Sequence, residues 1–132
     1  MNFNKFTIKA REAVQAAIDL AQNENNQAVE PAHILLALLT DSENVTVGIL
    51  QKIGASIPVL QEEIRKEISR FPVVKGASVS GQYLSGPSNE LFDRSQKEAD
   101  ALNDEYISSE HILLAMLEGT SEAGRLLKSQ GV

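Results

Sequence analysis

The amino-acid sequence predicts an all-α domain built from two tandem copies of one helical unit. The strongest observation is a seven-residue run, His-Ile-Leu-Leu-Ala-Leu-Leu at 33–39, which returns as His-Ile-Leu-Leu-Ala-Met-Leu at 111–117. The match extends outward at the same spacing, because Val29 precedes the first histidine just as Ile107 precedes the second. Repeated helical units bury their apolar faces against one another. We therefore expect the copies to pack as one globular domain, related by an approximate two-fold axis.

The expected domain comprises all 132 residues, with repeat 1 over 1–71, a connection over 72–88 and repeat 2 over 89–132. We expect about four helices in each repeat and no β-strand. Proline and glycine interrupt helical patterns. The prolines and glycines of the connection alternate with serines. They are Pro72, Gly76, Gly81, Gly86 and Pro87.

The first two predicted helices differ in their apolar patterns. Over 8–22, small apolar residues, mostly alanine, recur at helical spacing on one face, and Thr7 is expected to cap that helix. The second helix is predicted to begin at Glu30 and Pro31, because proline is well tolerated in a first turn. It contains the run at 33–39, which is apolar nearly all round, so this helix should be the buried one.

Two further helices are predicted in the first copy. Residues 45–53 form a short apolar segment that Gly54 should end. Residues 57–71 carry apolar side chains every three or four positions with charged residues between them, which is typical of an amphipathic surface helix. Pro58 lies near the expected start, and Pro72 is expected to stop the helix.

The second copy repeats this order after the connection. Helical spacing resumes at Leu91 and continues to Leu102, and residues 103–106 read as a turn. Ser108 is then expected to cap the next helix. Glu110 falls in the first turn of that helix, where the helix dipole favours a carboxylate.

Composition excludes several functional classes. A net charge of -6 argues against a nucleic-acid surface, which needs basic side chains to neutralise phosphates. Residues 76–132 carry nine acidic and four basic side chains, against nine and eight in 1–75, which favours a basic or unfolded polypeptide as partner. The sequence has no cysteine, no long apolar segment and no secretory signal, so we expect a cytoplasmic protein without disulfides or a membrane partner.

The motifs with possible chemistry are incomplete. Glu30 and His33 have the E-x-x-H spacing of di-iron bundles, but Ser108 stands where the second copy would need glutamate. We therefore interpret His33 and His111 as packed or capping side chains. Residues 76–81 resemble a G-x-S-x-G elbow with the second glycine one place late, and no phosphate-binding loop occurs. The sequence predicts no catalytic residue, metal site or cofactor within this chain.

The doubled unit with its His-Ile-Leu-Leu core resembles the Clp amino-terminal domain, the module at the front of the Clp ATPase chaperones. The resemblance covers essentially the whole chain. Within that family, Phe-Pro-Val-Val-Lys-Gly at 71–76 and Asp-Glu-Tyr-Ile-Ser-Ser-Glu-His at 104–111 look like the ClpB disaggregase branch. The ClpA and ClpC branches lack the first of these segments.

The resemblance implies the substrate-binding amino-terminal domain of an ATP-dependent disaggregase, which engages unfolded or aggregated polypeptide. It also implies a homohexameric full-length protein with co-chaperone partners, whose ATPase modules beyond Val132 bind ATP and magnesium. The isolated domain is expected to be a monomer that binds neither nucleic acid nor membranes. The alternative is an adaptor-docking domain of a Clp protease-associated ATPase, in which a folded partner occupies the surface.

The same resemblance assigns substrate handling to Thr7, Asp104 and Glu110. Each residue also has a structural interpretation, as helix cap, turn residue and dipole partner respectively. Carboxylates beside a shallow apolar groove could accept hydrogen bonds from unpaired backbone donors and attract Lys or Arg. If Asp104 and Glu110 meet substrate, replacing both with alanine should weaken binding of an unfolded protein and cost about 1 kcal/mol of stability or less. If they are structural instead, the double variant should melt several degrees lower.

Overall fold

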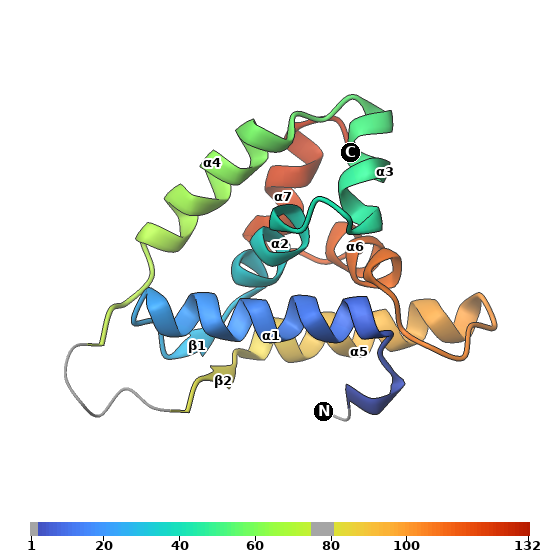
Figure 1. Cartoon of the computed structure of the whole chain (residues 1–132), viewed down its shortest axis with the longest axis horizontal. Coiled ribbons are helices and arrows are strands. Elements are labelled where there is room, and N and C mark those ends of the chain that lie inside the picture. The colour runs from blue at the N-terminus through green and yellow to red at the C-terminus, as the bar shows by residue number, and fades with distance from the viewer. Residues whose placement is uncertain (1–2, 75–80) are drawn as a thin grey trace.

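The computed structural model describes residues 3–74 and 81–132 and confirms the all-α class (Figure 1). In chain order its elements are η1 (Phe3–Lys5), α1 (Ile8–Asn23), β1 (Ala28–Val29), α2 (Pro31–Thr40), α3 (Val45–Ile53), α4 (Ile57–Ser69), β2 (Tyr83–Leu84), α5 (Gly86–Ala101), α6 (Ser109–Glu118) and α7 (Glu122–Ser129). The elbow-like segment at 76–81 and the end of the motif at 71–76 fall largely outside the described residues.

Helix α2 is the centre of the domain. Every residue from Pro31 to Leu39 is buried, and only Thr40 at its end is exposed. The helix contacts all of the other α-helices in the described part of the chain. In Figure 1, α1 and α5 run along the base, and α2 and α6 lie above them. The prediction that the helix containing 33–39 is the buried one is confirmed.

The alanine face of α1 packs against α2. Small side chains let two helix backbones approach closely, and burial here is nearly complete. The buried α1 residues are Ala10, Ala13, Val14, Ala17 and Ala21. Helices α5 and α6 form the corresponding contact in the second half of the chain.

Most predicted helix ends are confirmed. Thr7 Oγ1 accepts a hydrogen bond from Ala10 N at 3.2 Å, so Thr7 caps α1. Gly54 ends α3 in the left-handed conformation at φ 100°. Asn25 and Asn103, which follow α1 and α5, share φ 58°, a conformation that asparagine tolerates better than most residues.

Short parallel pairings join the two halves, so the expectation of no strand is wrong in this detail. Strand β1 pairs with β2, and Phe6 forms an isolated parallel bridge with Ile107. The amide of Thr7 donates to Ile107 O at 2.9 Å, and the amide of Ser85 donates to Val29 O at 3.1 Å. The first extended segment of each half thus pairs with the second extended segment of the other half. The two-fold relation between complete repeats stays a prediction.

Helix α5 begins earlier than the sequence indicated. It starts at Gly86, so residues 86–88 are helical and do not belong to the connection. Ser85 Oγ accepts from the Ser88 amide at 3.1 Å, and the Ser88 hydroxyl donates to Val29 O at 2.6 Å. Pro87 fits because a first helical turn does not need its missing N–H. The described second half contains three α-helices, one fewer than the expected four.

None of the described helices is by itself long and apolar enough to cross a membrane. Helices α2 and α3 meet the length and composition requirement only together, as a pair bent by 89° at the break between them.

Two glycines give a matched test of the packing. A Cβ atom on Gly124 would lie 2.3 Å from Met116 O, so Gly124→Ala should displace α7 from α6 and lower the free energy of unfolding by about 1–3 kcal/mol. Gly48 lies exposed within α3 with no atom near its Cβ position, so Gly48→Ala should raise stability by up to about 1 kcal/mol. Urea denaturation of both variants measures this, and equal effects would contradict the packing described.

Candidate functional site

Thr7 stands where the N-terminal segment meets the segment before α6. Its amide donates to Ile107 O, and Ile107 N in turn donates to Lys5 O at 2.8 Å. Since its hydroxyl caps α1, the amide and the hydroxyl of Thr7 both have structural partners. Thr7 is nevertheless only partly buried, so part of this residue borders the surface.

Three phenylalanines hold this N-terminal segment in place. The rings of Phe3, Phe6 and Phe92 lie edge to face, with centroids between 5.1 and 5.7 Å apart. Edge-to-face aromatic pairs contribute beyond the area they bury. Because Phe92 belongs to α5, this cluster fixes the start of α1 against the second half of the chain.

Asp104 is bonded to the buried His111. Its Oδ2 lies 2.8 Å from His111 Nε2, and the Asp104 side chain is 50% exposed whereas that of His111 is 6% exposed. His111 Nδ1 accepts from the Ser108 amide at 2.9 Å. A ring nitrogen that accepts carries no proton, so the proton of the neutral ring lies on Nε2 and is donated to Asp104. Asp104 is therefore more than a turn residue, because its carboxylate accepts this hydrogen bond.

The first half makes the same cap with an uncharged partner. His33 Nδ1 accepts from the Glu30 amide at 2.9 Å, and its Nε2 lies 2.9 Å from Asn26 Oδ1. The side-chain amide of Asn26 donates to Pro72 O, so this side chain is fixed against the segment that follows α4. Burial lowers the pKa of His33 to about 4. An uncharged partner suits this place, because Asn26 is buried and Asp104 is not.

Ser108, His111 and Asp104 lie in the order of a Ser-His-Asp triad. Ser108 Oγ is 3.0 Å from His111 Nδ1, on the opposite side of the ring from Asp104. The lone pair at Nδ1 already accepts from the Ser108 backbone. Since a general base needs that lone pair for the nucleophile's proton, the arrangement caps α6 rather than activating Ser108. His33 and His111 are thus capping side chains, as predicted.

Glu110 and three exposed apolar side chains lie within a few positions of these residues along the chain. Glu110 is exposed in the first turn of α6, and Leu114, 40% exposed, lies one turn further along. Ile8, next to Thr7, is 67% exposed, and Tyr106, next to Ile107, is 52% exposed. We call this region the Thr7 surface, and its residues are Thr7, Ile8, Asp104, Tyr106, Glu110 and Leu114.

One backbone hydrogen bond connects the segments that carry the three sequence-predicted residues. Thr7 is bonded to Ile107, which stands three residues from both Asp104 and Glu110 in the sequence. The sequence did not indicate the exposed apolar residues or the partner of Asp104. That partner could have been found, because the turn residue lies seven positions before the histidine in both copies, as Asn26 and Asp104.

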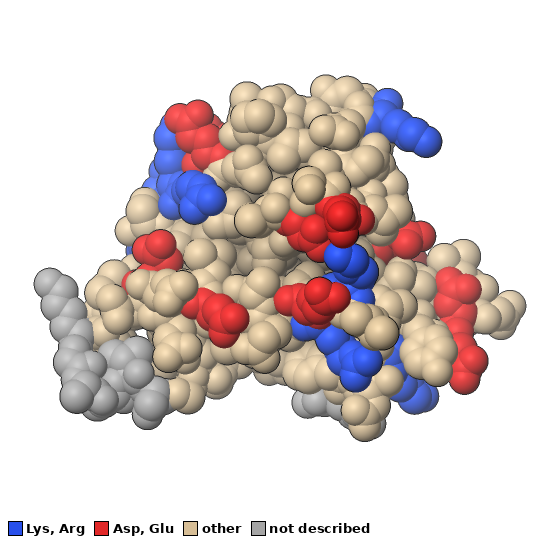
Figure 2. Space-filling view, in the orientation of Figure 1, with Lys and Arg blue, Asp and Glu red and all other residues tan. Residues whose placement is uncertain are grey.

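Charged side chains on the face in Figure 2 form several small groups, in which acidic and basic side chains lie next to one another between neutral areas. Lys9, near the start of α1, pairs with Asp41 at 3.0 Å and with Glu43 at 3.8 Å. Within residues 3–74 and 81–132, no group of three or more His, Cys, Asp or Glu side chains could hold a metal ion. In the E-x-x-H motif, both ring nitrogens of His33 already have hydrogen-bond partners.

Solved structures show which class of protein has this fold. The N-terminal domain of Hsp104 from Candida albicans superposes with a TM-score of 0.84 at 19% identity, covering 98% of this chain and 83% of that chain. The N-terminal domain of ClpD from Arabidopsis thaliana gives a TM-score of 0.69 at 21% identity, covering 99% and 90%. The fold is that of the amino-terminal domains of Clp ATPases.

Sequence comparison then identifies the family. The profile of the Clp repeat (R) N-terminal domain matches residues 5–130. The chaperone protein ClpB of Bacteroides thetaiotaomicron is 42% identical over 132 residues, and ClpB of Porphyromonas gingivalis is 36% identical over 131. These alignments cover 100% and 99% of this chain but 15% of each relative. The chain belongs to the Clp N-terminal domain family and is similar to the corresponding part of ClpB.

Two substitutions of Asp104 measure separately what its negative charge and its hydrogen bond contribute to stability. Asp104→Ala leaves the buried Nε2–H of His111 without its acceptor and should lower the free energy of unfolding by about 1–3 kcal/mol. Asp104→Asn supplies the amide oxygen that Asn26 provides to His33, so it should cost less than about 1 kcal/mol. Urea denaturation distinguishes them, and equal losses would show that the bond contributes nothing.

Stability should fall on acidification through pH 6.5 to about 4. The unfolded chain protonates His33 near its ordinary pKa of about 6.5, whereas burial holds the folded pKa at about 4. The unfolded state therefore binds the proton first, and the full loss is on the order of 3 kcal/mol. Unfolding free energies should show a smaller decline between pH 7 and 5 for His33→Gln than for the parent. Parallel declines would exclude His33 as the cause.

Proposed function

We propose that this domain binds unfolded or aggregated polypeptide, as the substrate-binding amino-terminal domain of an ATP-dependent disaggregase. The observation that carries the proposal is the Thr7 surface, which combines exposed apolar side chains with two carboxylates and a threonine. Similarity to ClpB over the whole chain supports it.

The chemistry of the Thr7 surface suits an unfolded chain. Such a chain exposes apolar side chains, which would contact Ile8, Tyr106 and Leu114. It also offers unpaired backbone N–H groups, from which Asp104 and Glu110 would accept hydrogen bonds. Its basic side chains would be attracted by the same two carboxylates. Because these contacts need no fixed sequence, binding would be weak and tolerant of many substrates.

The rest of the proposed protein follows from the relatives. Since this chain matches 15% of their length, the ATPase modules, with their ATP and magnesium, would lie elsewhere in a full-length protein. We propose a cytoplasmic homohexamer that works with co-chaperones, and a monomeric isolated domain without catalytic activity. Repeat 1, over 1–71, and repeat 2, over 89–132, would act as one binding unit.

An adaptor-docking domain is the alternative function. In that case a folded partner, not an unfolded chain, would occupy the Thr7 surface. The alternative differs from the first proposal in its ligand, so it can be tested with the same variants. A domain that binds a folded adaptor tightly but ignores unfolded protein would belong to the second class.

Charge removal at the Thr7 surface tests the proposal. The double variant Asp104→Asn/Glu110→Gln keeps the hydrogen bond to His111 while removing two negative charges. Its affinity for a permanently unfolded, fluorescently labelled model protein should fall about five-fold, as expected for two rim charges. The parent's affinity should also fall as salt is raised, because screening weakens such contacts.

A matched control is Glu62→Gln/Glu63→Gln on α4, which removes the same charge from another helix. The control should bind like the parent. Backbone NMR shifts during titration should cluster at residues 7–8, 104–106 and 110–114. Equal weakening by both double variants, or shifts confined to other regions, would refute the site assignment.

A further inference from the structure

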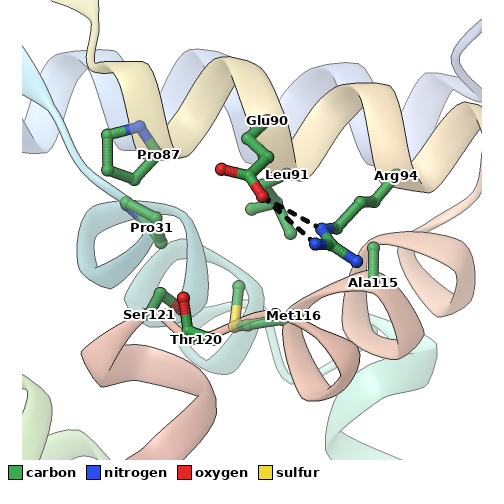
Figure 3. A pocket seen from close by; sticks show the side chains of 10 residues that line it. Pro31, Pro87, Glu90, Leu91, Arg94, Ala115, Met116, Thr120 and Ser121 are labelled. Carbon is green, nitrogen blue, oxygen red and sulfur yellow. Dashed lines mark hydrogen bonds and ion pairs between the residues drawn. The ribbon is translucent and has the colours of Figure 1, made fainter.

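Two hollows meet where the first turns of α2 and α5 approach α7. The first, of about 150 Å³, has an apolar floor that includes Leu91 and Met116. Figure 3 shows Pro31 and Pro87 at one end, and the Glu90–Arg94 ion pair on α5 along one side. The second hollow, of about 170 Å³, shares Pro31, Pro87 and Ser121 with the first. Because they share these residues, the hollows lie next to each other, and we call the two together the groove.

The second hollow combines apolar walls with carboxylates. Its apolar lining consists of Pro31, Ala32, Phe71, Pro87 and Ala123. Three carboxylates from different helices also line it: Glu30 before α2, Glu67 near the end of α4 and Glu122 at the start of α7. All three are partly buried, and no lysine or arginine is among the lining residues.

The charges around this hollow leave one negative charge in excess. Glu67 pairs with Arg70 at 3.3 Å, and Glu122 pairs with Arg125. Arg125, and to a smaller degree Arg70, lowers the pKa of Glu122, so this carboxyl stays ionised. The charges of these two carboxylates and two arginines cancel. The carboxylate of Glu30 is a fifth charge, which remains as the excess. A ligand group with one positive charge would neutralise the site.

We infer that this groove binds an extended polypeptide whose basic side chain enters the second hollow. The inference rests on the proposed function and adds a second contact point to it. The aliphatic stem of lysine or arginine would pack on Pro31 and Pro87, and its cationic group would lie among the carboxylates and beside the ring of Phe71. In an extended chain, residues i and i+2 face the same way, roughly 6–7 Å apart. An apolar residue two positions away would then reach the first hollow.

A short capped peptide with lysine and leucine two residues apart tests the inference by calorimetric titration. The variant Glu67→Gln/Glu122→Gln should bind it about ten-fold more weakly, because two carboxylate contacts to the cation are lost. Replacing lysine by uncharged norleucine should weaken binding to the parent about as much. That peptide should not distinguish the parent from the variant.

The matched control is Glu63→Gln, because Glu63 also pairs with a cation three residues on, Lys66, but does not line the groove. This control should bind the lysine peptide like the parent. NMR shifts should appear at Ala32, Phe71 and Ala123.

Several results would overturn the inference. Equal binding of the lysine and norleucine peptides by the parent would do so even if a variant failed to fold. Weakening by Glu63→Gln equal to that by the double variant would indicate unspecific attraction instead. Shifts only at the Thr7 surface would overturn the groove and leave the proposed function standing, whereas no binding of either peptide or of unfolded protein would overturn both.

Discussion

Complete burial of α2 is the constraint on which the remaining structure depends. A helix that is apolar on all sides is stable only if other elements cover it all round. Helices α1, α4 and α7 from both halves of the chain contact it, and so do α3, α5 and α6. The groove lies between α2, α5 and α7, where the first turn of α2, with Pro31, borders both hollows.

The sequence was sufficient to predict the elements whose signals are local. Helix ends at Thr7 and Gly54 follow from capping chemistry, and the buried helix follows from its apolar run. The early start of α5 was missed because Gly86 and Pro87 were read as breakers, although proline is well placed in a first turn. The pairing of Phe6 with Ile107 could not be predicted, because it joins segments a hundred residues apart and leaves no periodic signal.

In the candidate site, too, local features could be predicted from the sequence and non-local ones could not. Thr7, Asp104 and Glu110 were selected by family resemblance, and the segments that carry them are connected by the non-local bond between Thr7 and Ile107. The partner of Asp104 was encoded in the repeat itself, since Asn26 and Asp104 occupy equivalent positions before equivalent histidines. Burial explains the difference between them. Asn26 is covered by the chain near Pro72, where a carboxylate would be costly, and Asp104 reaches water.

The exchange of extended segments has a consequence for folding. Each half supplies the backbone partner for an extended segment of the other half. Neither half alone can therefore form these backbone hydrogen bonds. Forming these pairs closes loops of more than fifty residues before the native contacts compensate for the lost chain entropy. The domain should therefore fold as one cooperative unit despite its duplicated sequence. A partly unfolded form with one intact half would expose unpaired strand edges, the same feature that leads chains to aggregate.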